Sequence, residues 1–356
     1  MLTSFRRAIA PTAAVLSRLR AEPAGVQGDP PPEGVAAFEM EPYASPWWMR
    51  SGHLASLWAY YSKPKLPAYR RERLSTHDDD FLDIDWIDGG PDQPLVVVCH
   101  GLEGCSGSGY VRKLMHAVRE RSWHGVAPNY RGCSGEDNRR VYAYHSGWTV
   151  DLDFVVRTLV ARAPERPILL AGFSLGASIS ANWLGRRATE VPRQVRGAFL
   201  CSAPFYLTPC STRMERGFSR IYQRHFVQSL RIKALKKAKQ YPGSFDRRAV
   251  KRARTLRQFD AAFTCPISGF DSVEDYYHQA SCGPHLRHIR VPTLILNAVD
   301  DPLIPPDGSP AEAVDGNPAV RLVTTDRGGH CGFIARQPGW LERQAMTWFE
   351  RCLAGR

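Results

Sequence analysis

The stretch RPILLAGFSLGAS, residues 166–178, decides the fold that the sequence predicts. An apolar run of the kind found in buried strands ends at Phe173, and a helical pattern begins two residues later. Ser174 stands at the junction, between Gly172 and Gly176. Strand, G-x-S-x-G and helix in this order form a nucleophile elbow, a sharp turn whose glycines avoid clashes with neighbouring elements. On this stretch alone, a serine that only caps the helix is the alternative.

Short apolar runs alternate with helical patterns from residue 80 onward, which is typical of a doubly wound, mostly parallel α/β sheet. Because the runs are nearly continuous in apolar residues, helices should cover each strand on both faces of the sheet. The expected strands are residues 81–86, 94–99, 125–130, 167–173, 197–203, 293–299 and 320–325. The expected helices are residues 110–121, 149–163, 175–188 and 339–354.

One long gap interrupts this alternation, since roughly 85 residues between the strands 197–203 and 293–299 contain no strand pattern. A structureless connection of that length is rare in a compact domain, so the sequence predicts a helical insertion. Residues 205–260 hold 15 Lys and Arg against three Asp and Glu, an excess equal to the net charge of the whole chain, +12. Within 218–234 an apolar residue recurs at every fourth position, which predicts an amphipathic basic helix.

A glycine-rich turn, HGLEG at 100–104, follows the expected strand 94–99. Sites in sheets of this kind form at the carboxyl ends of the strands, and Ser174 lies at the same edge. We expect the backbone N–H groups of Leu102 and Leu175 to hold an oxyanion there. An ordinary loop between a strand and a helix is the alternative.

An acidic turn, NAVDDPLIP, follows one of the last two expected strands, and GGHCGF follows the other. A serine hydroxyl needs an imidazole to take its proton, and the imidazole needs a carboxylate to hold its tautomer. His330 is therefore the expected base for Ser174. Adjacent residues leaving a strand point in opposite directions, so only one of Asp300 and Asp301 can orient His330. The spacing D-x-x-hydrophobic-P favours Asp301, and Asp300 is the alternative.

Other polar residues carry weaker signals. Cys133, in NYRGCSG, has no partner histidine nearby in the sequence. His145, in YHSG, is expected to be structural, with Ser146 or Thr149 capping the helix that follows. No histidine or acidic cluster has metal-ligand spacing, and no phosphate-binding or dinucleotide-binding glycine motif follows a strand. The sequence therefore predicts neither a metal nor a cofactor.

Several segments together resemble the AB hydrolase 4 family of α/β-hydrolases, which includes the bacterial YheT-like esterases and eukaryotic relatives. They are SPWWMRSGHLASLW, HGLEG, NYRGCSGEDN, YHSG, GFSLGA, SAPF, MERGFSRIYQR, YPGSFD, DYY, NAVDDP and GGHCGF, from about residue 45 to the end of the chain. The resemblance implies a serine hydrolase without a cofactor, whose triad is Ser174, Asp301 and His330. Carboxylic esters are the usual substrates of the family, and acyl lipids are substrates of some relatives.

The predicted fold is an α/β-hydrolase fold, a mostly parallel doubly wound sheet with a helical cap insertion. We expect a flexible basic tail and linker (1–40), the first part of the core (41–204), the basic cap (205–290) and the second part of the core (291–356). The first 20 residues carry four arginines and no acid, so organelle targeting is an alternative to a disordered tail. Nine scattered cysteines without a C-x-x-C pair favour a reducing compartment, hence a cytoplasmic protein.

The predicted activity is cleavage of carboxylic esters through an acyl-enzyme intermediate. A lipase-like or phospholipase-like acyl hydrolase and a thioesterase are alternatives that use the same triad. The basic cap could also bring the protein to an anionic membrane surface, although no apolar run reaches the roughly 20 residues of a membrane span. A non-catalytic binding protein on the same fold is a further alternative, and no nucleic-acid partner is expected. The sequence predicts no oligomeric state.

Overall fold

The computed structural model describes residues 35, 38–65 and 67–355. Within them an eight-stranded sheet has the order β1-β2-β4-β3-β5-β6-β7-β8. The strands from β4 to β8 along this order are parallel, whereas β1 and β2 join antiparallel. The strands are β1 (Arg70–Ser75), β2 (Phe81–Ile87), β3 (Leu95–Cys99), β4 (His124–Asn129), β5 (Ile168–Phe173), β6 (Val195–Cys201), β7 (Thr293–Ala298) and β8 (Val320–Thr325).

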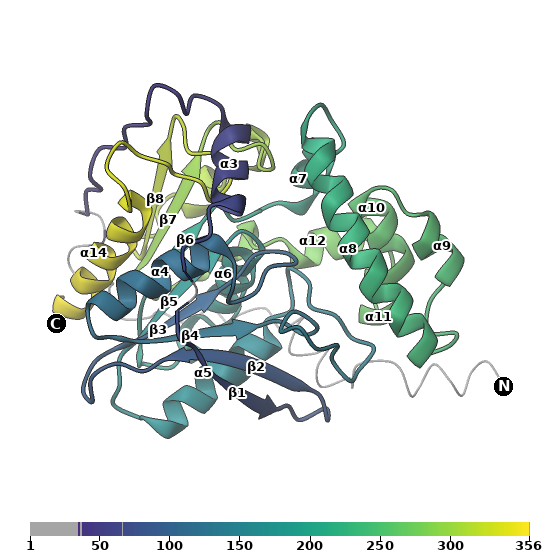
Figure 1. Ribbon diagram of the computed structural model, residues 1–356, viewed down its shortest axis with the longest axis horizontal. Helices are drawn as coiled ribbons and strands as arrows, with labels where there is room; N and C mark the ends of the chain where they lie inside the picture. Colours follow the sequence, from purple (N-terminus) through teal and green to yellow (C-terminus); the bar gives the residue numbers. More distant parts are fainter. Residues whose placement is uncertain (1–34, 36–37, 66, 356) are drawn as a thin grey trace.

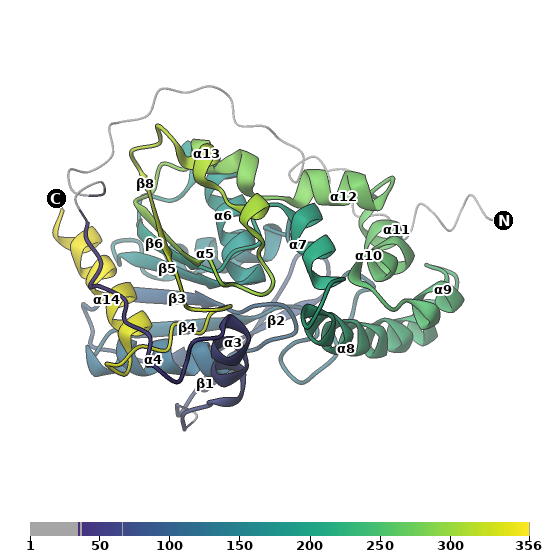
Figure 2. The same ribbon diagram turned by 90° about the horizontal axis from the view of Figure 1, so that it is seen from above.

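Helices cover both faces of the sheet (Figure 1 and Figure 2). α4 (Gly109–Glu120) and α14 (Trp340–Ala354) pack on one face. α5 (Val150–Arg162) and α6 (Leu175–Arg187) pack on the other. Every residue of β3, β5 and β7 is buried, because these strands have helices on both sides. The predicted doubly wound sheet is confirmed, and all the expected strands and helices occur within two residues of their expected ends.

The sequence did not predict β1 or α3 (Gly52–Tyr61). β1 has the polar sequence RRERLS because it is the edge strand and exposes most of its side chains. Two of its arginines pair with buried carboxylates of β2 across the ladder, Arg71 with Asp85 and Arg73 with Asp83, at N–O distances of 2.8 and 2.7 Å. Ion pairs replace the apolar alternation that would have revealed the strand.

The chain between β6 and β7 consists of helices joined by short turns and loops, and it lies beside the sheet, on the right of Figure 1. Its helices share a small hydrophobic cluster with Val141, which lies outside the segment; the cluster includes Ala234, Val250, Phe259, Phe263 and Ile267. Its elements are α7 (Leu207–Met214), α8 (Ser219–Gln240), α9 (Arg247–Arg252), α10 (Leu256–Phe259), the π-helix η2 (Asp260–Thr264), α11 (Cys265–Ser268), α12 (Val273–Ala280) and η3 (Gly283–His288). We use the term cap for residues 205–290, and the division of the chain into core and cap stays a prediction.

Three short helices complete the elements: η1 (Ala188–Glu190), η4 (Pro306–Gly308) and α13 (Ala311–Val314). The expectation of a flexible tail over residues 1–40 falls mostly outside the described residues. In the part of the chain that is described, no helix has the length and hydropathy needed to cross a membrane.

Candidate functional site

Ser174 lies in the tight turn between β5 and α6, with φ 53° and ψ −123°. A positive φ is unfavourable for a residue with a side chain, so the surrounding structure must hold this turn in place. Neither of the flanking glycine positions has room for a side chain. A Cβ at Gly172 would lie 2.6 Å from Ala177 Cα, and a Cβ at Gly176 would lie 2.4 Å from the carbonyl oxygen of His100. The local structure is therefore that of the nucleophile elbow that the sequence predicted.

The structure brings Ser174 together with His330 and Asp301. The Ser174 hydroxyl lies 2.7 Å from His330 Nε2, and His330 Nδ1 lies 2.8 Å from Asp301 Oδ2. The Asp301 side chain is 1% exposed and that of His330 is 13% exposed. In this chain of hydrogen bonds, the carboxylate accepts from Nδ1–H, which leaves Nε2 free to accept the proton of the serine.

The two adjacent carboxylates have different partners. Asp301 Oδ1 accepts hydrogen bonds from the N–H groups of Leu303 and Ile304, at 2.8 and 3.2 Å, and these fix the carboxylate against His330. Asp300 turns the other way and accepts from the Gly329 N–H at 2.8 Å. The contact with His330 thus belongs to Asp301, as the spacing of the acidic turn favoured, while Asp300 braces the loop that carries the histidine.

The backbone of His330 is held by Ser56, a residue that the sequence motifs did not predict to be part of the site. The hydroxyl of Ser56, in α3, accepts a hydrogen bond from the His330 N–H at 2.8 Å. α3 comes so close to the acidic turn that a Cβ at Gly52 would lie 1.9 Å from the Asp300 carbonyl oxygen. The segment SGHLAS is part of the resemblance to the family, and its small residues are the one sequence signal of this close packing.

The turn 100–104 faces the elbow, since a Cβ at Gly101 would lie 3.0 Å from Ser174 Cβ. The Gly101 N–H donates to the Tyr110 hydroxyl at 2.9 Å, and His100 Nδ1 donates to the Gly101 carbonyl at 2.7 Å. Burial lowers the pKa of His100 to about 4, so this histidine is neutral. Both backbone groups of Gly101 are thus fixed, and Leu102 is the next residue in the turn. The N–H of Leu175 opens α6 at the same site, next to Ser174.

Burial alone would lower the pKa of His330, but the Asp301 charge and its hydrogen bond oppose this, and the pKa is raised above the ordinary histidine value. Only the neutral imidazole can take a proton from serine. We therefore expect kcat/KM for an ester to rise with pH and to reach half its maximum above pH about 6.5, the ordinary histidine pKa. Asp301→Asn should move this limb to lower pH. Initial rates across a pH series would measure it, and a wild-type limb below the ordinary value would contradict the expected influence of Asp301.

Glu103 connects the turn 100–104 to the cap, a role that the sequence did not predict. Its carboxylate, on a side chain only 4% exposed, accepts from Lys233 Nζ at 2.9 Å and from the Ser229 hydroxyl, both on α8. Tyr144 is bonded to both ends of this residue, accepting from its N–H at 2.7 Å and donating to its carboxylate at 3.1 Å. A displacement of α8 would therefore displace Glu103, which directly follows the expected oxyanion donor Leu102.

Glu103→Ala should lower kcat about 10- to 100-fold with a smaller change in KM, because displacing an oxyanion donor by about 1 Å costs rates of this order. Lys236→Ala is the matched control. Lys236 also lies on α8 and pairs with Asp137 at 3.0 Å, but both side chains are well exposed. It should stay within about twofold of the parent, since exposed ion pairs contribute little. Equal losses in the two variants would show that Glu103 has no special role in positioning.

The weaker candidates lie apart from the hydroxyl of Ser174. Burial raises the pKa of the Cys133 thiol to about 11, which leaves it a poor nucleophile at neutral pH. His145 is buried, with its pKa lowered to about 3, and lies against the rings of Trp148, Phe270 and Tyr276. Thr149, one of the two expected capping residues, occupies the N-cap position of α5, but its side chain makes no capping hydrogen bond.

A cavity of about 150 Å³ extends from Ser174 and His330 to the underside of the cap. Most of its lining is apolar, and the cap contributes Leu207, Met214, Phe226, Leu230, Phe259, Phe263 and Ile267. A few polar groups are included, among them Lys233 and Asp260, and burial raises the pKa of Asp260 to about 6. Across the described residues, no three His, Cys, Asp or Glu side chains are grouped so that they could hold a metal ion.

A family model described as "Serine aminopeptidase, S33" (Hydrolase_4) matches residues 90–334, a span that contains the elbow, the acidic turn and His330. The chain belongs to this family. The hydrolase is 38% identical over 287 residues to "Putative esterase YheT" of Escherichia coli, an alignment that covers 78% of this chain and 83% of that one. It is 30% identical over 295 residues to human "Phospholipase ABHD3", covering 79% and 71% of the two chains.

Solved structures agree on the fold of the hydrolase. The esterase Pf2001 of Pyrococcus furiosus superposes with a TM-score of 0.53 at 18% identity, over 94% of this chain and 98% of that one. The resemblance drawn from the sequence is confirmed: the chain is an α/β-hydrolase of the esterase and lipase type.

Proposed function

We propose that this protein is a serine esterase that cleaves carboxylic esters through an acyl-enzyme intermediate, with Ser174, His330 and Asp301 as its triad. The observation that carries the proposal is the continuous set of hydrogen bonds from the Ser174 hydroxyl through His330 to the buried Asp301 carboxylate, at 2.7 and 2.8 Å. Groups in this geometry activate a hydroxyl that is otherwise a weak nucleophile.

In the first half of the reaction, His330 Nε2 takes the proton of Ser174 while Oγ forms a bond to the ester carbonyl carbon. The carbonyl oxygen becomes an oxyanion, and the N–H groups of Leu102 and Leu175 stabilise it. The intermediate collapses when the carbon–oxygen bond to the alcohol breaks, and the alcohol leaves with the proton held by His330. Asp301 stabilises the imidazolium while it exists and keeps its Nδ1–H oriented.

In the second half, a water molecule replaces the alcohol. His330 Nε2 takes a proton from the water as its oxygen bonds to the acyl carbon, and a second oxyanion forms in the same place. Collapse breaks the bond to Ser174 Oγ, which regains its proton from His330, and the carboxylic acid is released. Thioesters would pass through the same steps, so the triad does not by itself exclude a thioesterase.

The walls of the cavity favour substrates with an apolar acyl group. Each buried methylene contributes about 0.8 kcal/mol, or roughly fourfold in binding, as long as space remains. The name of the human relative, a phospholipase, is consistent with an acyl lipid, and we propose long-chain acyl lipids as the second candidate substrate class.

A series of p-nitrophenyl esters from acetate to dodecanoate, with one thioester of matched chain length, tests this proposal. The value of kcat/KM should rise from acetate by up to about fourfold per methylene and then level off when the cavity is full. Ser174→Ala is the blank for hydrolysis that the proposed triad does not catalyse. A series that is flat or falls from acetate onward would contradict an acyl site beneath the cap, and a large preference for the thioester would favour the thioesterase.

A further inference from the structure

Large hydrophobic side chains are exposed in one region of the surface. Among the described residues, eight of the ten exposed large hydrophobic side chains come from two short segments, 47–61 and 218–221. Trp47 and Tyr61 are the most exposed, at 74% each. We use the term hydrophobic ridge for six of these eight: Trp47, Trp48, Trp58, Tyr61, Phe218 and Ile221. An exposed patch rimmed by polar residues usually marks an interaction site.

The two segments form one surface because α3 packs along the first half of α8. His53 Nδ1 lies 3.2 Å from the Tyr222 hydroxyl, and the Tyr60 hydroxyl lies 3.2 Å from His225 Nε2. The ring of His53 also contacts that of Phe218, with centroids 4.7 Å apart. Figure 1 shows α3 and the upper end of α8 on the same side of the molecule.

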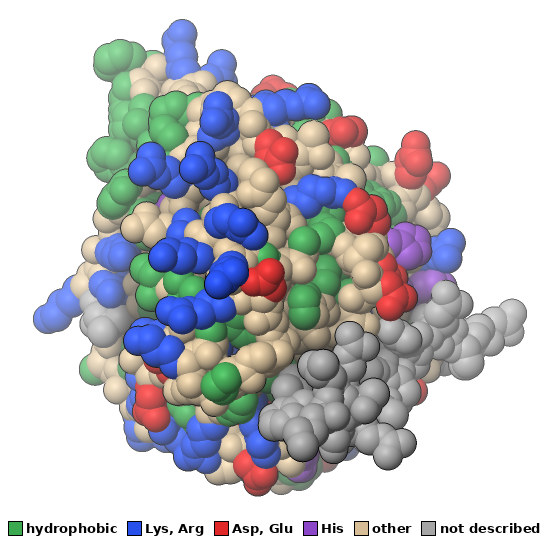
Figure 3. Space-filling model, turned by 90° about the vertical axis from the view of Figure 1, so that its right-hand side faces the viewer, with side chains coloured by type: hydrophobic (Ala, Val, Ile, Leu, Met, Phe, Trp, Pro, Cys, Tyr) green, Lys and Arg blue, Asp and Glu red, His purple; other side chains and the backbone are tan. Residues whose placement is uncertain are grey.

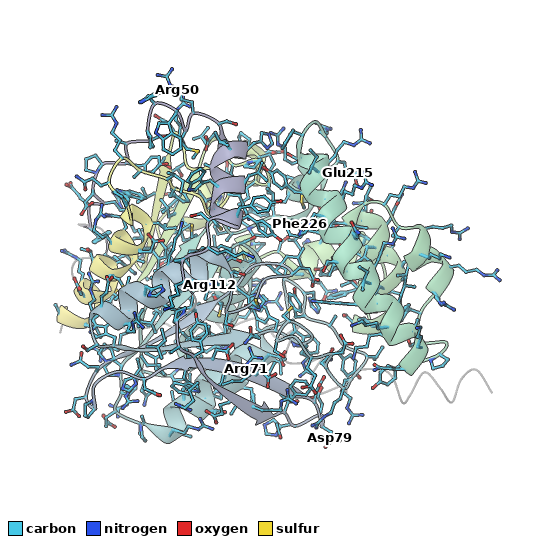
Figure 4. The ribbon with its side chains drawn as sticks, in the orientation of Figure 1. Arg50, Arg71, Asp79, Arg112, Glu215 and Phe226 are labelled. Carbon is cyan, nitrogen blue, oxygen red and sulfur yellow. The ribbon has the colours of Figure 1, made fainter. Side chains whose placement is uncertain are left out.

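Positive charge borders the hydrophobic ridge. Arg50 precedes α3 and points outward at the top of the molecule (Figure 4), and Lys63 and Lys65 follow α3. Residues 42–65 contain these three bases and no acid. In Figure 3, hydrophobic side chains gather at the upper left, next to a band of Lys and Arg side chains on the face of the cap.

A groove on the outer side of α8 continues this surface. We call it the arginine groove, because Arg220, Arg224, Arg231 and Arg254 line it; Glu215 is its one acidic residue, and its volume is about 970 Å³. Ile221 belongs both to this groove and to the hydrophobic ridge. Four arginines against one glutamate give the groove a positive charge, which suits anionic oxygens such as those of phosphate.

We propose that the hydrophobic ridge and the arginine groove together dock the protein on the surface of an anionic phospholipid bilayer. Tryptophan and tyrosine rings have an apolar body and a polar edge, which suits the boundary between headgroups and acyl chains. Arginine binds phosphate oxygens with two hydrogen bonds, and each base near an anionic surface contributes about 1 kcal/mol. A second copy joined through this same face by two-fold symmetry does not fit, because it would place one arginine groove against another.

Docking on this surface would place the catalytic site beside the lipid. Ser56 of α3 accepts the hydrogen bond from the His330 N–H. Phe226 of α8, labelled in Figure 4, lines the cavity, as does Leu230 of the same helix. Both helices of the docking surface therefore touch the site. The inference goes beyond the proposed reaction, because it does not depend on which ester is cleaved.

Flotation of the full chain with lipid vesicles tests the proposal. We expect binding to vesicles that contain one third phosphatidylserine, little binding to pure phosphatidylcholine, and a decrease at high salt. Two sets of variants address the two parts of the surface: Trp47→Ser with Trp58→Ser, and Arg220→Glu with Arg224→Glu. Each pair should weaken binding about tenfold or more, as expected for the loss of 1.4 kcal/mol or more.

The matched control is Arg247→Glu with Arg248→Glu, which makes the same change of charge on α9, away from the hydrophobic ridge. This pair should bind within about twofold of the parent, since a surface charge outside the contact acts only through screened long-range attraction. All variants should hydrolyse a short soluble ester like the parent, which separates loss of docking from loss of folding or of the proposed reaction. No flotation of the wild type, or equal losses in control and test pairs, would overturn the proposal. Binding to nucleic acid in place of vesicles would overturn it as well.

Discussion

Ser174→Ala should lower kcat for an ester by about 10⁴- to 10⁶-fold, the range found when the nucleophile of such a triad is removed. The reason is geometric. The Ser174 hydroxyl is the one that lies 2.7 Å from His330 Nε2, and the elbow presents it at the end of β5. Initial rates with a short-chain p-nitrophenyl ester would measure the loss. Because the methyl group of alanine fits the same space, the circular dichroism and melting temperature should be close to those of the parent.

Ser178→Ala is the matched control for this loss. Ser178 lies one turn further along α6 and is fully buried, but its hydroxyl donates to the Pro204 carbonyl at 2.7 Å. It should keep its activity within a few-fold, with at most about 1 to 3 kcal/mol lost in stability, because one buried carbonyl loses its donor. If Ser174→Ala kept the activity of the parent, another residue would have to be the nucleophile.

Asp301→Asn should lower kcat by about 10³- to 10⁴-fold, the second largest effect that we expect. An asparagine can offer its NH₂ group to His330 and stabilise the wrong tautomer, in which Nε2 carries the proton and cannot take that of Ser174. It also removes the charge that stabilises the imidazolium. Steady-state rates above pH 9 would show that the loss is not merely a shift of the pH profile.

Asp300→Asn makes the same chemical change one residue earlier and separates the two acids. Asp300 accepts from the Gly329 N–H and does not touch His330, and an asparagine oxygen can accept the same bond. The expected loss is about tenfold or less, as for one weakened hydrogen bond. If Asp300→Asn were as damaging as Asp301→Asn, the assignment of the acid would be wrong.

Much of the core followed from the sequence because burial leaves a simple pattern. β3, β5 and β7 have helices on both faces, so their residues are apolar in unbroken runs. β1 was missed for the opposite reason: its outer face is solvated, and its arginines pair with Asp83 and Asp85 on β2. Because charged residues stand where a half-buried strand usually has alternating apolar residues, β1 lacks the hydrophobic periodicity by which strands are predicted.

The residues of the candidate site also fall into two groups, those that the local sequence could predict and those that it could not. Ser174, Asp301 and His330 sit in turns whose glycine or proline spacing reflects the backbone, and such spacing can be read from one chain. Ser56 and Glu103 act through contacts with distant parts of the chain, at 274 and 130 residues from their partners His330 and Lys233. Only packing brings these pairs together, so no local pattern could have assigned their roles.

The central claim, that Ser174 is a nucleophile activated by His330, is tested most directly by covalent labelling. The wild-type protein would be treated with a fluorophosphonate probe, digested and analysed by mass spectrometry. We expect one probe adduct, on the peptide that contains Ser174, with labelling lost in Ser174→Ala and slowed strongly in Asp301→Asn. An unlabelled wild type, or an adduct that persists on another residue in Ser174→Ala, would contradict the account.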